Sequence, residues 1–214
     1  MLTSPSGKSR ISHPLKDRKM DLYETAPEAT ATLLRVENLP DVIWEPACGK
    51  GAIVRMLRAT GRTVYATDLV KYDSPDQDEV RWDFLSERQL PIGVQAIVTN
   101  PPYKNAAMFV RKALELCPKV VMLLRLNFLE SGNEKSEAGR ARIYCLDTHP
   151  PARVHVFRNR LPMQHRDGWE GSKTTNTIAF AWFSWDLSHV GPTEMHRVSW
   201  KPIRADIHKI HEDA

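Results

Sequence analysis

Short apolar segments alternate along the chain with segments that are expected to be helical. The runs 42–44, 96–98 and 120–124 are apolar throughout, which is typical of parallel strands buried on both faces. Residues 106–117 place apolar side chains at helical spacing, and a second helix is expected at 52–59. This alternation predicts an α/β fold with a doubly wound, mostly parallel sheet, for which we expect seven strands and a C-terminal antiparallel hairpin.

The same patterns divide the chain into three regions. Residues 1–20 are polar and basic with almost no periodicity, which favours a disordered tail; a phosphate-binding tail is the second interpretation. Residues 21–188 are expected to form one folded domain, and residues 189–214 a peripheral C-terminal extension. The remaining elements expected in the domain are helices at 27–37 and 137–146 and strands at 63–67, 153–157 and 177–185.

Charge and cysteine content narrow the class of protein. The 214 residues have a formal charge of +4, which is compatible with a nucleic-acid partner but not specific for one. No apolar run approaches the ~20 residues of a membrane span, and no signal peptide is recognisable, so we expect a cytoplasmic protein without membrane contact. Cys48, Cys117 and Cys145 form no C-x-x-C pair, so neither a disulfide framework nor a metal site is expected.

A glycine turn, defined here as residues 45–51, follows the first apolar strand. It reads Glu-Pro-Ala-Cys-Gly-Lys-Gly and leads directly into the expected helix. Gly49 and Gly51 let the backbone approach a ligand closely, although their spacing matches neither the dinucleotide G-x-G-x-x-G nor a P-loop. Asp68 ends the second strand, where a carboxylate can accept hydrogen bonds from both hydroxyls of a ribose. Turn and acid together indicate an adenosine-type ligand; the alternative is a solvated aspartate that caps a turn.

The strand at 96–98 ends in Thr99-Asn100-Pro101-Pro102-Tyr103. Two prolines fix φ and donate no backbone hydrogen bond, so the strand stops there. A polar amide, a rigid turn and an aromatic ring therefore stand together at the carboxyl end of a strand, where ligands bind in open α/β sheets. Taken alone, the segment also fits a strand-ending turn with a packed tyrosine. We call residues Asn100–Tyr103 the Asn-Pro-Pro-Tyr motif.

Two further segments contain candidate binding residues. Asp83 lies between Trp82 and Phe84, so the two rings could enclose a ligand ring while the carboxylate accepts from its amino group; alternatively, Phe84 is a core residue and Asp83 begins a turn. The loop at 158–176 is long, and its basic residues alternate with tryptophan, which suits phosphate contact and base stacking. A merely solvated loop fits this pattern equally. The candidates in the loop are Arg158, Arg160, Arg166, Trp169 and Lys173.

The order of four features resembles that in the class I S-adenosylmethionine-dependent amino-methyltransferases, and most of all that in the DNA N6-adenine methyltransferases. The features are the glycine turn, Asp68, Asp83-Phe84-Leu85 and the Asn-Pro-Pro-Tyr motif. The resemblance covers residues 21–185 and implies a Rossmann-like methyltransferase fold with S-adenosylmethionine as cofactor. The motif recurs in enzymes that act on DNA, RNA and protein glutamine, so it supports the reaction class better than the substrate. The chain has no room for a separate target-recognition domain of ~100 residues, so short-site recognition or a partner protein is implied.

The resemblance also implies a role for each matched residue. Tyr23 and Thr25 correspond to the segment beside the methionine part of the cofactor, and Asp68 to the residue that holds its ribose. The other implied cofactor contacts are Glu45, Ala47, Gly49, Gly51, Leu69, Asp83, Phe84 and Asn100. The implied catalytic residues are Asn100, Pro101, Pro102 and Tyr103, of which Tyr103 also contacts the target base.

The chemistry expected at the motif is methyl transfer to a planar nitrogen. If the side-chain oxygen of Asn100 and the carbonyl of Pro101 each accept one N–H, the lone pair of the amino nitrogen turns toward the methyl donor. The first hypothesis is therefore N6-adenine methylation of DNA. The alternatives are methylation of RNA adenine or of a protein glutamine amide, and a non-catalytic module that keeps the fold and serves a partner subunit.

Overall fold

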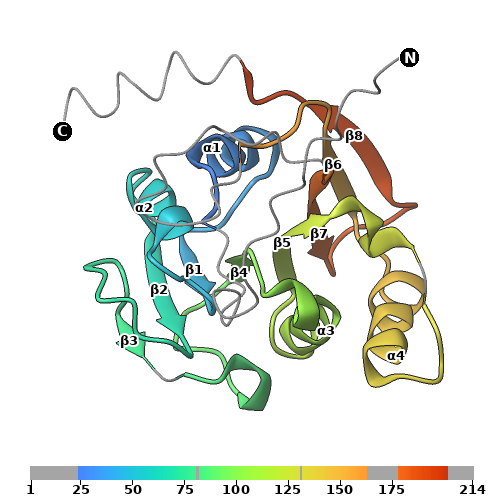
Figure 1. Ribbon diagram of the computed structural model, residues 1–214, viewed down its shortest axis with the longest axis horizontal. Helices are drawn as coiled ribbons and strands as arrows, with labels where there is room; N and C mark the ends of the chain where they lie inside the picture. Colours follow the sequence, from blue (N-terminus) through green and yellow to red (C-terminus); the bar gives the residue numbers. More distant parts are fainter. Residues whose placement is uncertain (1–23, 81, 131, 163–177, 202–214) are drawn as a thin grey trace, which may run out of the picture.

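The computed structural model describes residues 24–80, 82–130, 132–162 and 178–201 (Figure 1). The predicted basic tail at 1–20 lies outside the described residues, as do most of the long loop and the end of the predicted extension. The described part of the chain is layered, with one central sheet between two groups of helices.

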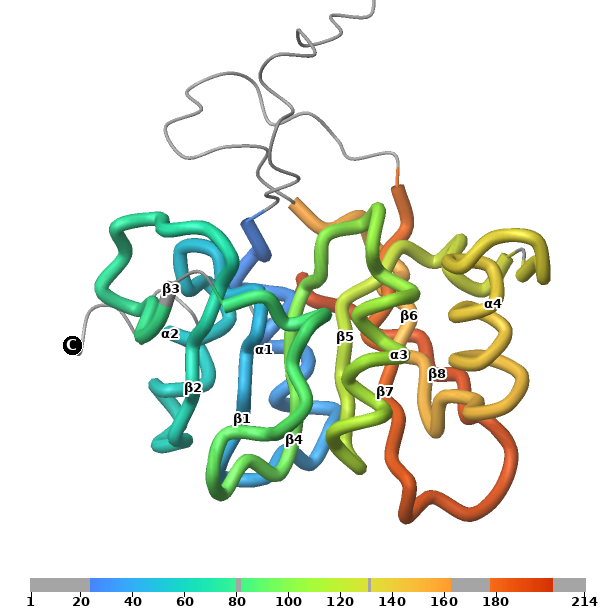
Figure 2. Tube along the Cα trace, turned by 90° about the horizontal axis from the view of Figure 1, so that it is seen from below, coloured from blue at the N-terminus to red at the C-terminus, as the bar shows by residue number. Residues whose placement is uncertain are grey.

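The central sheet contains eight strands among the described residues. They are β1 (Val42–Glu45), β2 (Thr63–Asp68), β3 (Glu79–Val80), β4 (Ala96–Thr99), β5 (Lys119–Arg125), β6 (Arg153–Phe157), β7 (Phe180–Asp186) and β8 (Glu194–Val198). Their order across the sheet is β3-β2-β1-β4-β5-β7-β6-β8, and Figure 2 shows them side by side. All run parallel except β7, which is antiparallel to both of its neighbours.

The doubly wound, mostly parallel sheet with an antiparallel pair near its C-terminus agrees with the prediction, but β3 and β8 are not predicted by the apolar pattern. β3 consists of two residues that pair with Thr67 and Asp68, so it is too short to produce a pattern. β8 is exposed along its length except at Val198, so it lacks the apolar run of a buried strand. Because β8 pairs with β6, the sheet continues past residue 188, where we expected the domain to end.

Helices cover both faces of the sheet. They are α1 (Pro27–Val36), α2 (Ala52–Arg58), α3 (Ala106–Leu116) and α4 (Glu137–Ile143). α1 and α2 pack on one face, and α3 and α4 on the other (Figure 1). Along β5, Val121 and Leu123 belong to the first core, whereas Val120 and Met122 belong to the second. Burial on both faces explains why this strand reads as a continuous apolar run.

The local sequence determines where the helices begin. Ala26 is the N-cap of α1, and Pro27 occupies the first turn, where its missing N–H removes no hydrogen bond. Ser136 caps α4 by accepting from the Gly139 N–H at 3.0 Å. α4 then continues as a π-helical turn at Tyr144–Thr148, so the helix predicted at 137–146 is present with a change of winding.

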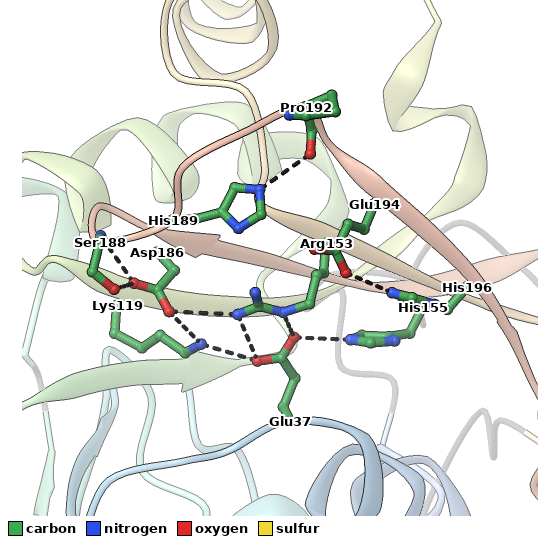
Figure 3. Close-up of polar contacts among 10 residues, drawn as sticks. All are labelled: Glu37, Lys119, Arg153, His155, Asp186, Ser188, His189, Pro192, Glu194 and His196. Atoms are coloured by element: carbon green, nitrogen blue, oxygen red, sulfur yellow. Dashed lines mark hydrogen bonds and ion pairs between the residues drawn. The ribbon is translucent and has the colours of Figure 1, made fainter.

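A buried ionic network joins the end of α1 to β5, β6 and β7 (Figure 3). The Glu37 carboxylate accepts from Arg153 Nε at 2.6 Å and from Lys119 Nζ at 2.9 Å, and His155 Nε2 lies 2.8 Å from it. Asp186 accepts from the same lysine at 3.1 Å. Burial acts to raise the pKa of Glu37, but the hydrogen bonds from His155, Arg153 and Lys119 outweigh it and hold that pKa well below its usual value. The network lies at the edge where β5 and β6 begin, which we call the amino edge.

Candidate functional site

The predicted turns leave the sheet at the opposite edge, called here the carboxyl edge because the parallel strands end there. β1 and β4 are parallel neighbours, so the glycine turn after β1 and the Asn-Pro-Pro-Tyr motif after β4 emerge beside each other. Asp68 ends β2, the neighbour of β1 on its other side. The connection from β1 crosses one face of the sheet through α2, and that from β4 crosses the other face through α3. The structure thus places the predicted features together at a topological switch point, where a crevice opens in α/β sheets.

Backbone hydrogen bonds hold the glycine turn against the end of β2. The Gly49 N–H donates to Asp68 Oδ2 at 2.9 Å, and the Cys48 N–H donates to the carbonyl of Thr67 at 3.0 Å. Gly49 and Gly51 have φ values of +54° and +83°, in the left-handed region that favours glycine. A Cβ at Gly51 would in addition overlap the side chain of Asp76. The path of this turn therefore depends on its glycines.

Two buried carboxyl groups lie at the glycine turn. Glu45, its first residue, is 2% exposed, and Asp68, which accepts from the turn, is 8% exposed. Burial raises the pKa of Glu45 well above its usual value, and the nearby charge of Asp68 adds to the shift. Burial also raises the pKa of Asp68, although N–H groups of Val70, Gly49 and Leu69 offset part of the effect. The Val70 N–H donates to Asp68 Oδ1 and the Gly49 N–H donates to Oδ2, and a carboxylate has about four lone-pair sites, so capacity remains to accept from ribose hydroxyls.

The Asn-Pro-Pro-Tyr motif is held by a residue far away in the sequence. Asn100 Nδ2 donates to Thr25 Oγ1 at 3.0 Å, and Thr25 is 5% exposed just before α1. Because this bond engages the amide nitrogen with Thr25, the other end of the side chain, Oδ1, is the atom that could accept a hydrogen bond from a target. Pro102 then precedes a single 3-10 turn at Tyr103–Asn105, which leads into α3. The segment predicted beside the cofactor and the predicted target site are therefore in direct contact.

The ring of Tyr103 contacts an arginine. The Cζ atom of Arg125 lies 4.1 Å from the centre of the Tyr103 ring, and the centre of the Phe180 ring lies 5.9 Å away. Arg125 ends β5 and Phe180 begins β7, so all three side chains belong to the carboxyl edge. The resemblance implies that Tyr103 contacts the target base, but Arg125 belongs to no recognisable motif and is not predicted from the sequence.

At the Asp83 segment the structure has the second of the two predicted arrangements. Phe84 is 2% exposed, and its ring packs 5.2 Å from Trp44 and 5.0 Å from Phe109 between centres. The Phe84 ring is therefore part of the core, and the cofactor contact expected of Phe84 stays a prediction. Asp83 is exposed and begins a 3-10 turn by accepting from the Leu85 N–H at 3.1 Å.

The structure describes only part of the remaining predicted set. Leu69 is 60% exposed after β2, and Ala47 is half-buried in the glycine turn. Arg158 and Arg160 are exposed where the chain leaves β6 at the carboxyl edge. The predicted residues outside the described ranges are Tyr23, Arg166, Trp169 and Lys173, and their roles stay predictions.

Metal and thiol chemistry find no support in the described residues. Within ranges 24–80, 82–130, 132–162 and 178–201, no three His, Cys, Asp or Glu side chains gather in a way that could hold a metal ion. Cys48, Cys117 and Cys145 are buried free thiols whose pKa values are raised by burial, which makes them poor nucleophiles. None of the helices in this part of the chain is both long and apolar enough to cross a membrane.

No protein-family model and no curated protein matches the sequence, but solved structures share its fold. One is a modification subunit of a candidate type I restriction enzyme from Vibrio vulnificus, with a TM-score of 0.55 at 12% identity over 83% of this chain and 47% of that one. A candidate class I S-adenosylmethionine-dependent methyltransferase from Listeria monocytogenes has a TM-score of 0.50 at 12% identity, over 85% of this chain and 68% of that one. A candidate RNA methyltransferase from Pyrococcus horikoshii has a TM-score of 0.50 at 11% identity, over 74% and 81%. The chain therefore has an α/β methyltransferase-like fold.

Proposed function

We propose that the protein transfers a methyl group from S-adenosylmethionine to the exocyclic N6 amino group of adenine in DNA. The proposal rests on one observation: the glycine turn with Asp68 and the motif with Asn100 leave neighbouring strands at the same edge of the sheet. The first group of residues suits the cofactor, and the second suits a planar amino group. A methyl donor and its acceptor can therefore meet at this edge, and the methyltransferase-like fold supports the same conclusion.

The described residues fit the cofactor in three places. Asp68 would accept from the ribose hydroxyls, the glycine turn admits a ligand close to the backbone, and Asp83 offers an exposed carboxylate for the adenine amino group. When bound, S-adenosylmethionine supplies an electrophilic methyl group on a positively charged sulfur. Thr25, which the resemblance places beside the methionine part of the cofactor, would link that part to the target site because its hydroxyl accepts from the Asn100 amide.

The motif would activate the target by hydrogen bonding. An exocyclic amino nitrogen is a poor nucleophile because its lone pair is delocalised into the ring. Asn100 Oδ1 and the Pro101 carbonyl would each accept one N–H, which favours a tetrahedral nitrogen whose lone pair points at the methyl group. The two prolines keep these acceptors from relaxing, so the rate enhancement comes from positioning and electrostatics. In a duplex the base must first leave the stack, at a cost of a few kcal/mol.

DNA is the preferred substrate of the proposal, and RNA adenine is the second candidate. The order of motifs along the chain most resembles DNA N6-adenine methyltransferases, and exposed Arg158 and Arg160 at the carboxyl edge suit a polyanion. Solved structures of this fold include both a restriction-enzyme modification subunit and a candidate RNA methyltransferase, so either nucleic acid is compatible with the architecture. A separate subunit for sequence recognition belongs to the proposal as well.

The experiment is label transfer from tritiated S-adenosylmethionine to plasmid DNA, total RNA and a protein extract in parallel. We expect label in DNA, and we expect Asn100→Ala to lower the rate at least 100-fold, as removal of a preorganised hydrogen-bonding group does in other enzymes. Cofactor affinity, measured by calorimetry, should change by no more than a few fold.

Asn105→Ala is the matched control. It removes the same side chain five positions later, where Asn105 is exposed and makes no capping hydrogen bond. Label confined to RNA or protein would refute the DNA substrate, and full activity of Asn100→Ala would refute the mechanism. Failure of the wild type to bind the cofactor would instead favour the non-catalytic module.

A further inference from the structure

Arg125 lies beside the proposed target site, and no acidic partner for it is found among the residues that the structure describes. Its guanidinium stacks on Tyr103, and its Nε is buried without a hydrogen-bond acceptor. Among the described residues no carboxylate lies within ion-pair distance of it. By contrast, Arg153 pairs with Glu37, and Arg55 pairs with Asp76 at 2.7 Å. Arg125 is thus a partly buried cation at the carboxyl edge whose positive charge no carboxylate of the described residues neutralises.

Such an arrangement is costly for the free protein. Burying the Nε–H of Arg125 without an acceptor is unfavourable, and the cation–π contact with Tyr103 offsets only part of that cost. A guanidinium also has five N–H donors in a planar fork that matches the oxygens of a phosphate. The missing partner is therefore most simply an anion that arrives with the substrate.

We propose that Arg125 binds a backbone phosphate next to the target base, and so makes this site selective for a nucleic acid over a protein amide. The inference rests on the proposed function, since it concerns the same site. A glutamine side chain in a protein brings no phosphate, so it could not neutralise Arg125. A nucleotide brings a phosphate within reach of any base that enters the site.

The stacking distance gives Arg125 a second property. At 4.1 Å from the ring centre, the guanidinium fills the layer in which a base would stack on that face of Tyr103. A base that uses this face displaces the guanidinium, and the long arginine side chain keeps the charge at the edge of the site. Arg125 thus contacts Tyr103 in the free protein and the phosphate in the complex.

The test measures binding of a fluorescein-labelled pool of random 40-bp duplexes by anisotropy, at several NaCl concentrations and with S-adenosylhomocysteine present. Loss of one phosphate contact should reduce the slope of log affinity against log salt by about 0.9. Arg125→Ala should therefore show this reduction and bind about tenfold more weakly, as expected for a charge-assisted hydrogen bond. In label-transfer assays its KM for plasmid DNA should rise by a similar factor, with kcat changed less than threefold.

Two variants separate this role from a merely structural one. Arg111→Ala removes another arginine that lies over a tyrosine ring, 5.7 Å from Tyr144, but one that pairs with Glu115 on α3. It should leave the salt slope unchanged. Arg125→Lys keeps the charge and should retain the slope while losing part of the affinity.

An Arg125→Ala protein with an unchanged salt slope would overturn the inference, whether or not its kcat falls, and would leave the proposed function standing if the wild type methylates DNA. A reduced slope in a protein that transfers no methyl group to DNA would support the phosphate contact and refute the proposed activity.

Discussion

Gly51 connects the sequence to the proposed cofactor site at the scale of a single residue. Its φ of +83° and its contact with Asp76 both exclude a side chain, whereas Gly61 has almost the same φ of +81° and no neighbour that a Cβ would approach. Substitution at Gly61 therefore tests backbone strain alone, whereas substitution at Gly51 tests strain together with steric overlap. The pattern of the sequence distinguishes them only by position, because Gly51 lies in the glycine turn and Gly61 precedes β2.

We predict that Gly61→Ala lowers the free energy of unfolding by about 1 kcal/mol, the cost of a left-handed conformation for alanine, and leaves cofactor affinity unchanged. Gly51→Ala should lower it further, because the new methyl group displaces Asp76, and should weaken S-adenosylmethionine binding at least tenfold. Urea unfolding and calorimetry on both proteins provide the comparison. Equal losses of stability and affinity in the two variants would show that the glycine turn has no special role.

At the scale of residues, the conformation of a turn could be predicted from the sequence, whereas contacts between distant segments could not. The turns at residues 45–51 and 100–103 were predicted because φ restricts which residues fit there; the binding and catalytic roles of these residues stay predictions. The Thr25–Asn100 hydrogen bond joins residues 75 positions apart, and no local pattern reports it. For Phe84 the sequence left two arrangements open, because an aromatic residue beside an acidic one fits a core as well as a ligand site.

At the scale of elements, α1 connects the two edges of the sheet. The residue before its N-cap, Thr25, contacts the Asn-Pro-Pro-Tyr motif at the carboxyl edge, and its C-cap, Glu37, lies in the ionic network at the amino edge (Figure 3). Lys119 and Arg153 bind Glu37 and also Asp186, so the network ties the helix to three strands. We infer that it fixes the position of α1, and through it that of Thr25.

We predict that Glu37→Gln lowers the free energy of unfolding by about 3 kcal/mol, because it leaves Lys119 and Arg153 short of a buried partner. Glu115→Gln is the control, since Glu115 forms an i,i+4 pair with Arg111 on the surface of α3, and its loss should stay below about 0.5 kcal/mol. Urea unfolding at pH 7 measures both. A loss in Glu37→Gln as small as that in the control would mean that the network adds nothing to stability.

The network also predicts how stability depends on pH. Hydrogen bonds from Ser188 and Lys119 outweigh burial and lower the pKa of Asp186 to about 2, and the pKa of Glu37 is lowered as well. A carboxyl group with a lowered folded-state pKa stabilises the fold above its ordinary pKa, and this contribution is lost as pH falls from about 5 towards 2. Wild type should therefore lose more stability over this range than Glu37→Gln. Parallel losses in the two proteins would contradict the assignment.

At the scale of the whole molecule, the sheet and its carboxyl edge could be predicted, and the outer parts could not. Alternation of apolar runs and helical segments specified the doubly wound core, because strands buried on both faces leave a continuous pattern. β8 escaped prediction because an exposed edge strand needs only backbone partners, and its sequence resembles a loop. Arg125 was not predicted because its contact with Tyr103 depends on β5 lying next to β4, and only the order of the strands in the folded sheet shows this.

The central claim is that the carboxyl edge transfers a methyl group to the amino nitrogen of adenine. Nucleoside mass spectrometry of plasmid DNA after incubation with the protein and S-adenosylmethionine tests this most directly. The account predicts N6-methyldeoxyadenosine with the wild type and with Asn105→Ala, formed at a rate at least 100-fold lower with Asn100→Ala. Methylation of deoxycytidine instead, or N6-methyldeoxyadenosine at equal levels with Asn100→Ala, would contradict it.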